Sequence, residues 1–92
     1  MNQVVTDNTA ERRFELPLDG NQLAFVDYLR RGDVIIMTHA EVPSALQGRG
    51  IGARLVGGAL DIVRARGEKV VPQCPYVAVF IRRHPAYQAL LA

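Results

Sequence analysis

The first half of the chain alternates apolar and polar residues, and the second half changes to a helical period. Four stretches combine this alternation with β-branched or aromatic residues, which is typical of strands. We expect strands at residues 3–6, 12–16, 21–32 and 33–42. Turn chemistry in DNTA (7–10) and PLDG (17–20) separates the first three, and the alternation slips near Asp27. Short connections between consecutive strands favour antiparallel pairing, so these stretches predict a four-stranded meander.

A helix is predicted over residues 50–66, where apolar residues recur every three or four positions. The residues that form this stripe are Ile51, Leu55, Ala59, Ile62 and Val63. Two arginines, Arg64 and Arg66, fall in the expected last turn, and Gly67 follows them. Cations near the end of a helix and glycine just after it are usual termination signals.

The remaining residues predict one more strand and a C-terminal helix. KVVP (69–72) is a short strand that follows a helix, so a right-handed crossover would make it parallel to a neighbouring strand. PYVAVFIRRH (75–84) predicts a helix that stops before Pro85, and residues 86–91 add a final helical turn. The expected order is β-β-β-β-α-β-α, an α/β (α+β) fold in a single domain over residues 1–92.

Composition narrows the class of protein. Ninety-two residues with 49% hydrophobic content provide a real core, and the formal charge of +2 is mild. Ten arginines stand against one lysine, which suits fixed contacts with phosphate or carboxylate groups. The modest charge and sparse aromatic residues argue against nucleic-acid binding. Cys74 is the single cysteine, so neither an intrachain disulfide nor a cysteine metal cluster is expected. With neither a secretory signal nor a membrane span in the sequence, we expect a cytoplasmic location.

Three glycines, Gly48, Gly50 and Gly52, stand immediately before or within the start of the predicted helix. The phosphate loop of nucleotide hydrolases is excluded, because no Lys-Ser or Lys-Thr pair follows. The dinucleotide fingerprint G-x-G-x-x-A is matched through Ala53, with Glu68 at about the right distance. The context contradicts it, because AEVPSALQ separates the glycines from the preceding strand and the strands are too few for a doubly wound sheet.

A third pattern, Q-x-x-G-x-G/A, is matched at every position by QGRGIG, residues 47–52. Backbone amides of such a loop and the first free N–H groups of the helix converge on one point and favour an anion there. Glycines let the backbone approach a pyrophosphate without Cβ atoms in the way.

This pattern is the acetyl-CoA signature of the GNAT (GCN5-related) N-acetyltransferase superfamily. The chain resembles the small single-domain GNAT-like proteins over THAEVPSALQGRGIGARLV and KVVPQCPYVAVFIRRHPAYQALL, about residues 33–91. The resemblance implies an acyl-CoA site in a cleft where two parallel strands, 34–41 and 69–73, splay apart. Larger members insert two helices between the first two strands, and here only DNTAE stands there. The acceptor side should therefore be open.

The resemblance also implies which residues bind the cofactor. The backbone of the signature loop would hold the pyrophosphate, and the backbone of Glu41 and Val42 would pair with the pantetheine arm. Cys74 would lie near the thioester, because in this fold the thioester sulfur lies close to the end of the fifth strand, which Cys74 follows. Family members carry a cysteine at this C-P-Y position. The loop residues are Gln47, Gly48, Arg49, Gly50, Ile51 and Gly52.

Three residues, His39, Glu41 and Cys74, are the main candidates for catalysis. His39 and Glu41 fall on one face of the fourth strand by period-two spacing, and either could take the proton of an acceptor amine. The alternatives are a hydrogen-bonded histidine and a solvated glutamate. Cys74 could be a nucleophile, could line the pocket, or could be a small buried apolar residue. Either Tyr76 or Tyr87 could donate a proton to the departing thiolate, or both could be core or surface aromatics.

The sequence therefore predicts an N-acetyltransferase that binds acetyl-CoA, uses no metal, and transfers the acetyl group to an unknown amine by direct attack. The acceptor could belong to a protein or peptide. A second interpretation is a CoA-binding regulatory or interaction module with little or no transferase activity. A plain interaction domain is a third.

Overall fold

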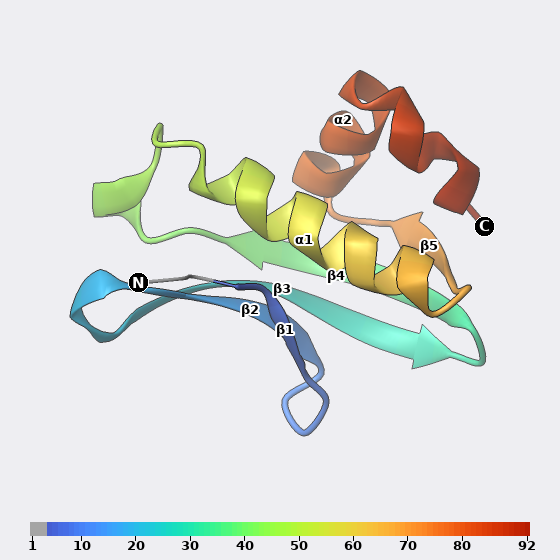
Figure 1. The fold of residues 1–92 in the computed structure, drawn as a ribbon, viewed down its shortest axis with the longest axis horizontal. Helices are drawn as coiled ribbons and strands as arrows, with labels where there is room; N and C mark the ends of the chain where they lie inside the picture. Colours follow the sequence, from blue (N-terminus) through green and yellow to red (C-terminus); the bar gives the residue numbers. More distant parts are fainter. Residues whose placement is uncertain (1–3) are drawn as a thin grey trace.

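The fold is seen in a computed structural model that describes residues 4–92; Gln3, at the start of the first expected strand, lies outside the described residues. Strands β1 (Thr6–Asn8), β2 (Arg13–Leu18), β3 (Gln22–Arg31) and β4 (Val34–Glu41) form the expected antiparallel meander. Strand β5 (Lys69–Pro72) pairs with β4 in parallel, so the five-stranded sheet follows chain order. Figure 1 shows helices α1 (Ile51–Ala65) and α2 (Pro75–Arg83) on the same face of this sheet.

The boundaries of the first strands differ from the expectation. β1 begins at Thr6 because Val5 packs its side chain against Gly58 of α1 instead of pairing in the sheet. The polar residues Asp7 and Asn8, expected in a turn, belong to β1 because each has a partner there. β2 continues through Leu18, whose side chain is buried, and the turn moves to a 3-10 segment at Asp19–Asn21.

Helix α1 presents one apolar stripe to the sheet, as its period predicts. Ile51, Leu55, Ala59 and Val63 are buried as expected, and Val56 and Leu60 are buried with them. Ile62, also expected in the stripe, is only partly buried. The helix ends as predicted, with Arg66 as the C-cap and Gly67 in the left-handed conformation at a φ of 68°. Burying a side chain of this size stabilises a fold by about 1.5–3 kcal/mol, so this stripe fixes α1 on the sheet.

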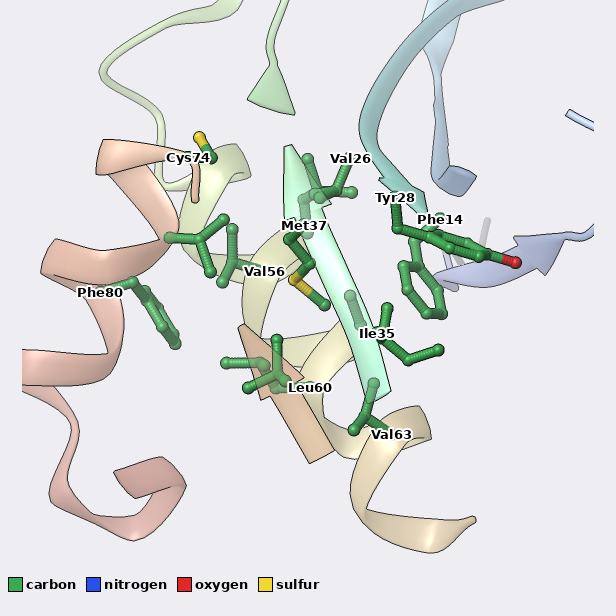
Figure 2. Close-up of a cluster of buried hydrophobic side chains, with 14 of the residues drawn as sticks. Phe14, Val26, Tyr28, Ile35, Met37, Val56, Leu60, Val63, Cys74 and Phe80 are labelled. Carbon is green, nitrogen blue, oxygen red and sulfur yellow. The ribbon is translucent and has the colours of Figure 1, made fainter. Parts of the chain in front are cut away.

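The core lies between α1, α2 and the inner face of the sheet (Figure 2). Phe14 and Tyr28 meet with ring centroids 4.9 Å apart, and Met37 lies fully buried on β4. Two glycines in the middle of α1 allow close packing on two sides. A Cβ on Gly58 would collide with Val5 at 2.5 Å, whereas a Cβ on Gly57 would meet Phe80 at an ordinary 3.6 Å.

The C-terminal end of α1 is fixed by a buried carboxylate. The Asp7 side chain is 3% exposed and accepts hydrogen bonds from the Tyr28 hydroxyl at 2.6 Å and from Arg66 at 2.8 Å. Glu68 extends this network through an ion pair with Arg30. Burial raises the pKa of Tyr28 to about 12, and the hydrogen bond to Asp7 acts in the same direction.

The chain ends beside the sheet. After α2, a 3-10 segment (Pro85–Leu90) leads to a parallel bridge between Leu91 and Val70 of β5. The backbone N–H of Ala92 donates to the Val70 carbonyl at 3.0 Å. This bridge covers part of the outer edge of β5, and no sequence pattern predicted it.

Candidate functional site

Strands β4 and β5 separate after four paired positions. Their register runs from Val34–Lys69 to Met37–Pro72, and the Cys74 N–H makes one further bond, to the Met37 carbonyl at 2.9 Å. β4 continues to Glu41, whereas the chain after β5 turns into α2. The expected splay therefore lies just beyond Met37, and the last four residues of β4 keep a free edge on the side that β5 leaves.

An extra residue in β4 decides which side chains face this splay. Asp27 pairs with His39 and Tyr28 pairs with Met37, so Thr38 has no counterpart on β3. The Thr38 hydroxyl donates to the Asp27 carbonyl at 3.3 Å, at the bulge. Such a bulge reverses the alternation of the strand.

The reversal is visible in the burial of the following residues. Before the bulge, Met37 points into the core; after it, Ala40 and Val42 pack against the core. His39 and Glu41 are turned outward instead, and their side chains are 58% and 59% exposed. The slip expected near Asp27 is present, but its additional residue lies on β4 and not on β3.

The connection from β4 to α1 is shaped by two left-handed glycines. Gly48 and Gly50 have φ angles of 83° and 75°, values that a residue with a Cβ rarely adopts. The Gln47 side-chain amide donates to the Val42 carbonyl at 3.2 Å and ties the loop back to the end of β4. Gly50 is the N-cap of α1 and, lacking a side chain, provides no side-chain cap.

The loop, the free end of β4 and the start of α1 enclose one cavity of about 440 Å³. It is lined by Ala40, Val42, Leu46, Gln47, Gly48, Gly50, Ile51, Gly52, Ala53, Leu55 and Tyr76. Apolar side chains from β4 and α1 form much of this lining, and backbone of the glycine loop forms the rest. The shape therefore combines an apolar part with a backbone part that is free of side chains.

The backbone part of this cavity has the chemistry of an anion site. The first backbone bond of α1 runs from the Arg54 N–H to the Gly50 carbonyl, at 3.2 Å, so the earlier N–H groups of the helix lack an intrahelical acceptor. A Cβ added at Gly48 or Gly50 would have no atom within 4 Å. This open space is where a phosphate could approach the backbone, so the residues present fit the diphosphate of a CoA ester.

Most of the predicted cofactor residues lie together at this cavity, and three do not. Those that line it are Val42, Gln47, Gly48, Gly50, Ile51 and Gly52. Glu41, Arg49 and Cys74 are absent from its lining. Glu41 is absent because the Thr38 bulge turns its side chain to the opposite face of the sheet, which leaves its backbone at the free edge of β4.

The three catalytic candidates are divided between two environments. His39 and Glu41 lie on the face of the sheet away from the helices, with Nε2 and Oε1 3.6 Å apart, so the period-two spacing did bring them together. Cys74 is 5% exposed at the N-cap of α2, and Figure 2 shows it at the edge of the buried cluster. The point where β4 and β5 separate therefore has the exposed pair His39 and Glu41 on its outer side and Cys74 on the side of the helices.

Sequence reasoning missed several lining residues. Ala40, Leu46, Ala53 and Leu55 carry no chemical signal, and only the fold brings them to the cavity. The sequence suggests Tyr76 only as a possible proton donor, and the structure shows that it also lines the cavity. Among residues 4–92, no helix is long and apolar enough to cross a membrane, and no three His, Cys, Asp or Glu residues form a metal-binding group.

Comparison with known proteins agrees with this architecture. A solution structure of a Staphylococcus aureus protein described as GCN5-like superposes with a TM-score of 0.74 at 22% identity, covering 99% of this chain and 89% of the other. Protein NATD1 of mouse is 33% identical over 88 residues, which covers 94% of this chain and 80% of NATD1. Human NATD1 matches at the same identity over 78% of its length. A sequence profile of the GCN5-related N-acetyltransferases matches residues 13–90. The chain therefore belongs to the GCN5-related N-acetyltransferase family.

Proposed function

We propose that the chain binds acetyl-CoA in the cavity at the start of α1 and transfers the acetyl group to an amine. The observation that carries this proposal is the joint lining of one cavity by the left-handed glycine loop, the first turn of α1 and the free end of β4. Family membership supports acetyl-CoA as the cosubstrate. When bound, acetyl-CoA supplies an activated acetyl group as a thioester.

Different parts of the cavity would bind different parts of acetyl-CoA. Backbone N–H groups from Gly48 to Ala53 would hold the diphosphate, helped by the positive end of the α1 dipole. The free edge of β4, including the backbone of Glu41 and Val42, would pair with the amides of the pantetheine arm as an added strand does. Arg49, in the same loop, would add a cation near the phosphates.

The transfer itself would be a direct attack in a ternary complex. The neutral nitrogen of the acceptor amine would form a bond to the thioester carbonyl carbon while the C–S bond breaks. The nitrogen would then give up one proton, and the sulfur, leaving as a thiolate, would take one up. The amine must first lose a proton, and Glu41 or His39 would accept it on the outer side of the splay. Because both side chains are more than half exposed, the acceptor would reach them from open solvent, as an amine on a protein or peptide can.

Cys74 would border the thioester without forming a covalent intermediate. Its burial argues for this, because a covalent nucleophile must be reached by both the thioester and the acceptor amine, and Cys74 is only 5% exposed. Under direct transfer, the Cys74→Ala variant keeps most of its turnover and binds acetyl-CoA within about tenfold of wild type, a difference of 1.4 kcal/mol. An acetyl adduct on Cys74 that passes to an amine, detected by mass spectrometry of the intact protein, would contradict direct attack.

A second candidate function is a CoA-binding module with little or no transferase activity. The observation that favours it is the exposure of His39 and Glu41, because side chains that lie mostly in solvent are not held by the protein in a fixed position against an acceptor. Calorimetric titration with acetyl-CoA tests both candidates together, and turnover on a panel of amines separates them. Absence of any heat and of any melting shift at millimolar acetyl-CoA would refute both.

A further inference from the structure

The structural reason for glycine at the third loop position, Gly52, differs from the reason at the first two. Gly48 and Gly50 have positive φ angles and open space around a would-be Cβ. Gly52 lies inside α1, where its φ is not positive, so its backbone conformation would accept any residue. A Cβ at Gly52 would lie 2.3 Å from the hydroxyl oxygen of Tyr76 and 2.8 Å from its Cζ. Glycine at this position therefore makes room for the Tyr76 ring.

Tyr76 holds a special place in the cavity. It stands in the first turn of α2, two residues after Cys74, and among the described lining residues it is the one that α2 contributes. The residue is 49% exposed although it carries a large aromatic ring. Tyr76 thus lines the cavity from α2, and its ring lies beside Gly52 in the first turn of α1, where the diphosphate would bind.

We infer that position 52 is glycine so that the Tyr76 ring can lie against α1, and that this ring is the wall that positions the acyl-CoA in the cavity. The inference rests on the proposed function. A methyl group at position 52 would push the ring away from α1 without unfolding the protein, because a half-exposed tyrosine can rotate into solvent. The effect of such a change should therefore fall on ligand binding and not on stability. Besides its backbone N–H, which would face the diphosphate, position 52 acts through Tyr76 by lacking a side chain, and in this respect it is a positioning residue.

A cycle of variants tests this division of roles. Affinity for acetyl-CoA is measured by calorimetry for wild type, Gly52→Ala, Tyr76→Ala and the double variant. We expect each single change to weaken binding about tenfold, or 1.4 kcal/mol, and the double variant to bind no more weakly than Tyr76→Ala alone. The inference is overturned if Gly52→Ala leaves the affinity unchanged. It is also overturned if the double variant binds about tenfold more weakly than Tyr76→Ala alone.

Two further variants separate the ring from the hydroxyl and from general effects on the helix. Tyr76→Phe keeps the wall and should bind within about threefold of wild type. Gly57→Ala changes a glycine of the same helix whose Cβ would make ordinary contacts of 3.6 Å with Phe80 and 3.7 Å with Tyr87. It should leave affinity unchanged, which shows that a methyl group on α1 is not harmful in itself. A loss in Tyr76→Phe as large as in Tyr76→Ala would overturn the role of the ring as a wall.

The contact can also be examined without any ligand. In NMR spectra of the free protein, the Tyr76 ring resonances should shift in Gly52→Ala and stay in place in Gly57→Ala, while both variants melt no lower than wild type. If wild type does not bind acetyl-CoA, the proposed function fails, and these ring resonances still decide whether Gly52 makes room for Tyr76. Unmoved resonances in Gly52→Ala would overturn the contact on which the inference depends.

Discussion

The two ends of helix α1 are built in opposite ways. At its N-terminal end the cap is Gly50, which offers no side-chain hydrogen bond, and the first turn lines a cavity. At its C-terminal end Arg66 binds the buried carboxylate of Asp7, and the Arg66 N–H donates to the Ile62 and Val63 carbonyls. Each end also has a left-handed glycine, Gly50 or Gly67, with open space beside it. A left-handed glycine therefore lies beside a hydrogen-bonded ion pair at the C-terminal end of α1 and beside a cavity at its N-terminal end.

Under the proposed function, the difference places stability at one end of a single helix and ligand binding at the other. An unsatisfied helix start next to a cavity costs stability, and in this chain the network around Asp7 lies about the full length of α1 away, some 15 residues. Because changes at independent distant sites usually add, variants at one end should leave the property of the other end unchanged. The following predictions test that separation.

The largest effect is expected from Gly50→Val. A β-branched residue is strongly disfavoured at a φ of 75°, so the loop would leave its path and the N–H groups would no longer converge. Acetyl-CoA affinity should fall by at least about a hundredfold in calorimetry, or 2.7 kcal/mol. Gly67→Val is the matched control, because Gly67 has a φ of 68° and equally open space at the other end of α1. It should lose comparable stability and keep its affinity, and an equal loss of affinity in both variants would refute the separation.

Asp7→Ala should have the next largest effect, on stability alone. The Tyr28 hydroxyl would be left buried without its acceptor and Arg66 without its carboxylate, which costs about 2–3 kcal/mol. A loss of that size lowers the melting temperature of so small a domain by more than about 10 °C. Asp61→Ala is the control, because Asp61 also accepts a bond from a tyrosine, Tyr87, but its side chain is 60% exposed. It should melt within a few degrees of wild type, about 0.5 kcal/mol. Weakened acetyl-CoA binding in folded Asp7→Ala would connect the two ends.

The same network predicts how stability depends on alkaline pH. The pKa of Tyr28 is about 12 in the fold and 10.0 in an ordinary environment, so between these values the folded chain keeps a proton that the unfolded chain has lost. The free energy of unfolding contributed by Tyr28 is therefore complete below pH 10 and decreases as pH rises toward 12, by about 2 kcal/mol in all. Chemical denaturation at pH 9 and pH 11.5 measures this decrease. Tyr28→Phe should show a smaller decrease, and an identical pH dependence in both proteins would contradict the assignment.

The smallest effects concern the middle of α1, where the glycine pair gives opposite results. Gly57→Ala has room for its methyl group and gains the higher helix propensity of alanine, so it should be stabilised by up to about 1 kcal/mol. Gly58→Ala places a methyl group 2.5 Å from Val5 and should be destabilised by a similar amount. Thermal melts of the two variants give the comparison directly. Equal shifts of the same sign would mean that Val5 does not pack tightly on α1.

Much of this fold could be predicted because its signals are local. The stripe of α1, its termination at Gly67 and the loop at Gln47–Gly52 each depend on neighbouring residues, and each is present as expected. The start of β1 could not be predicted, because Asp7 owes its strand position to Tyr28 and to Arg66, 59 residues away. The contact between Gly52 and Tyr76 could not be predicted for the same reason, because it joins α1 to α2, which β5 separates in the sequence.

Local patterns also could not predict that His39 and Glu41 point away from the cavity. Nothing in THAEV distinguishes a regular strand from one with an extra residue at Thr38. Period-two spacing correctly kept His39 and Glu41 together, but it could not decide which face of the sheet they occupy. That choice depends on the register with β3, which is a long-range property.

The bulge at Thr38 makes the chemistry of this site sensitive to chain length rather than to residue identity. Removing this one residue would restore regular alternation and exchange the faces of the four residues that follow it. His39 and Glu41 would then point toward the helices, and Ala40 and Val42 would point toward solvent. A single-codon deletion would thus turn charged side chains toward an apolar cavity without a single substitution.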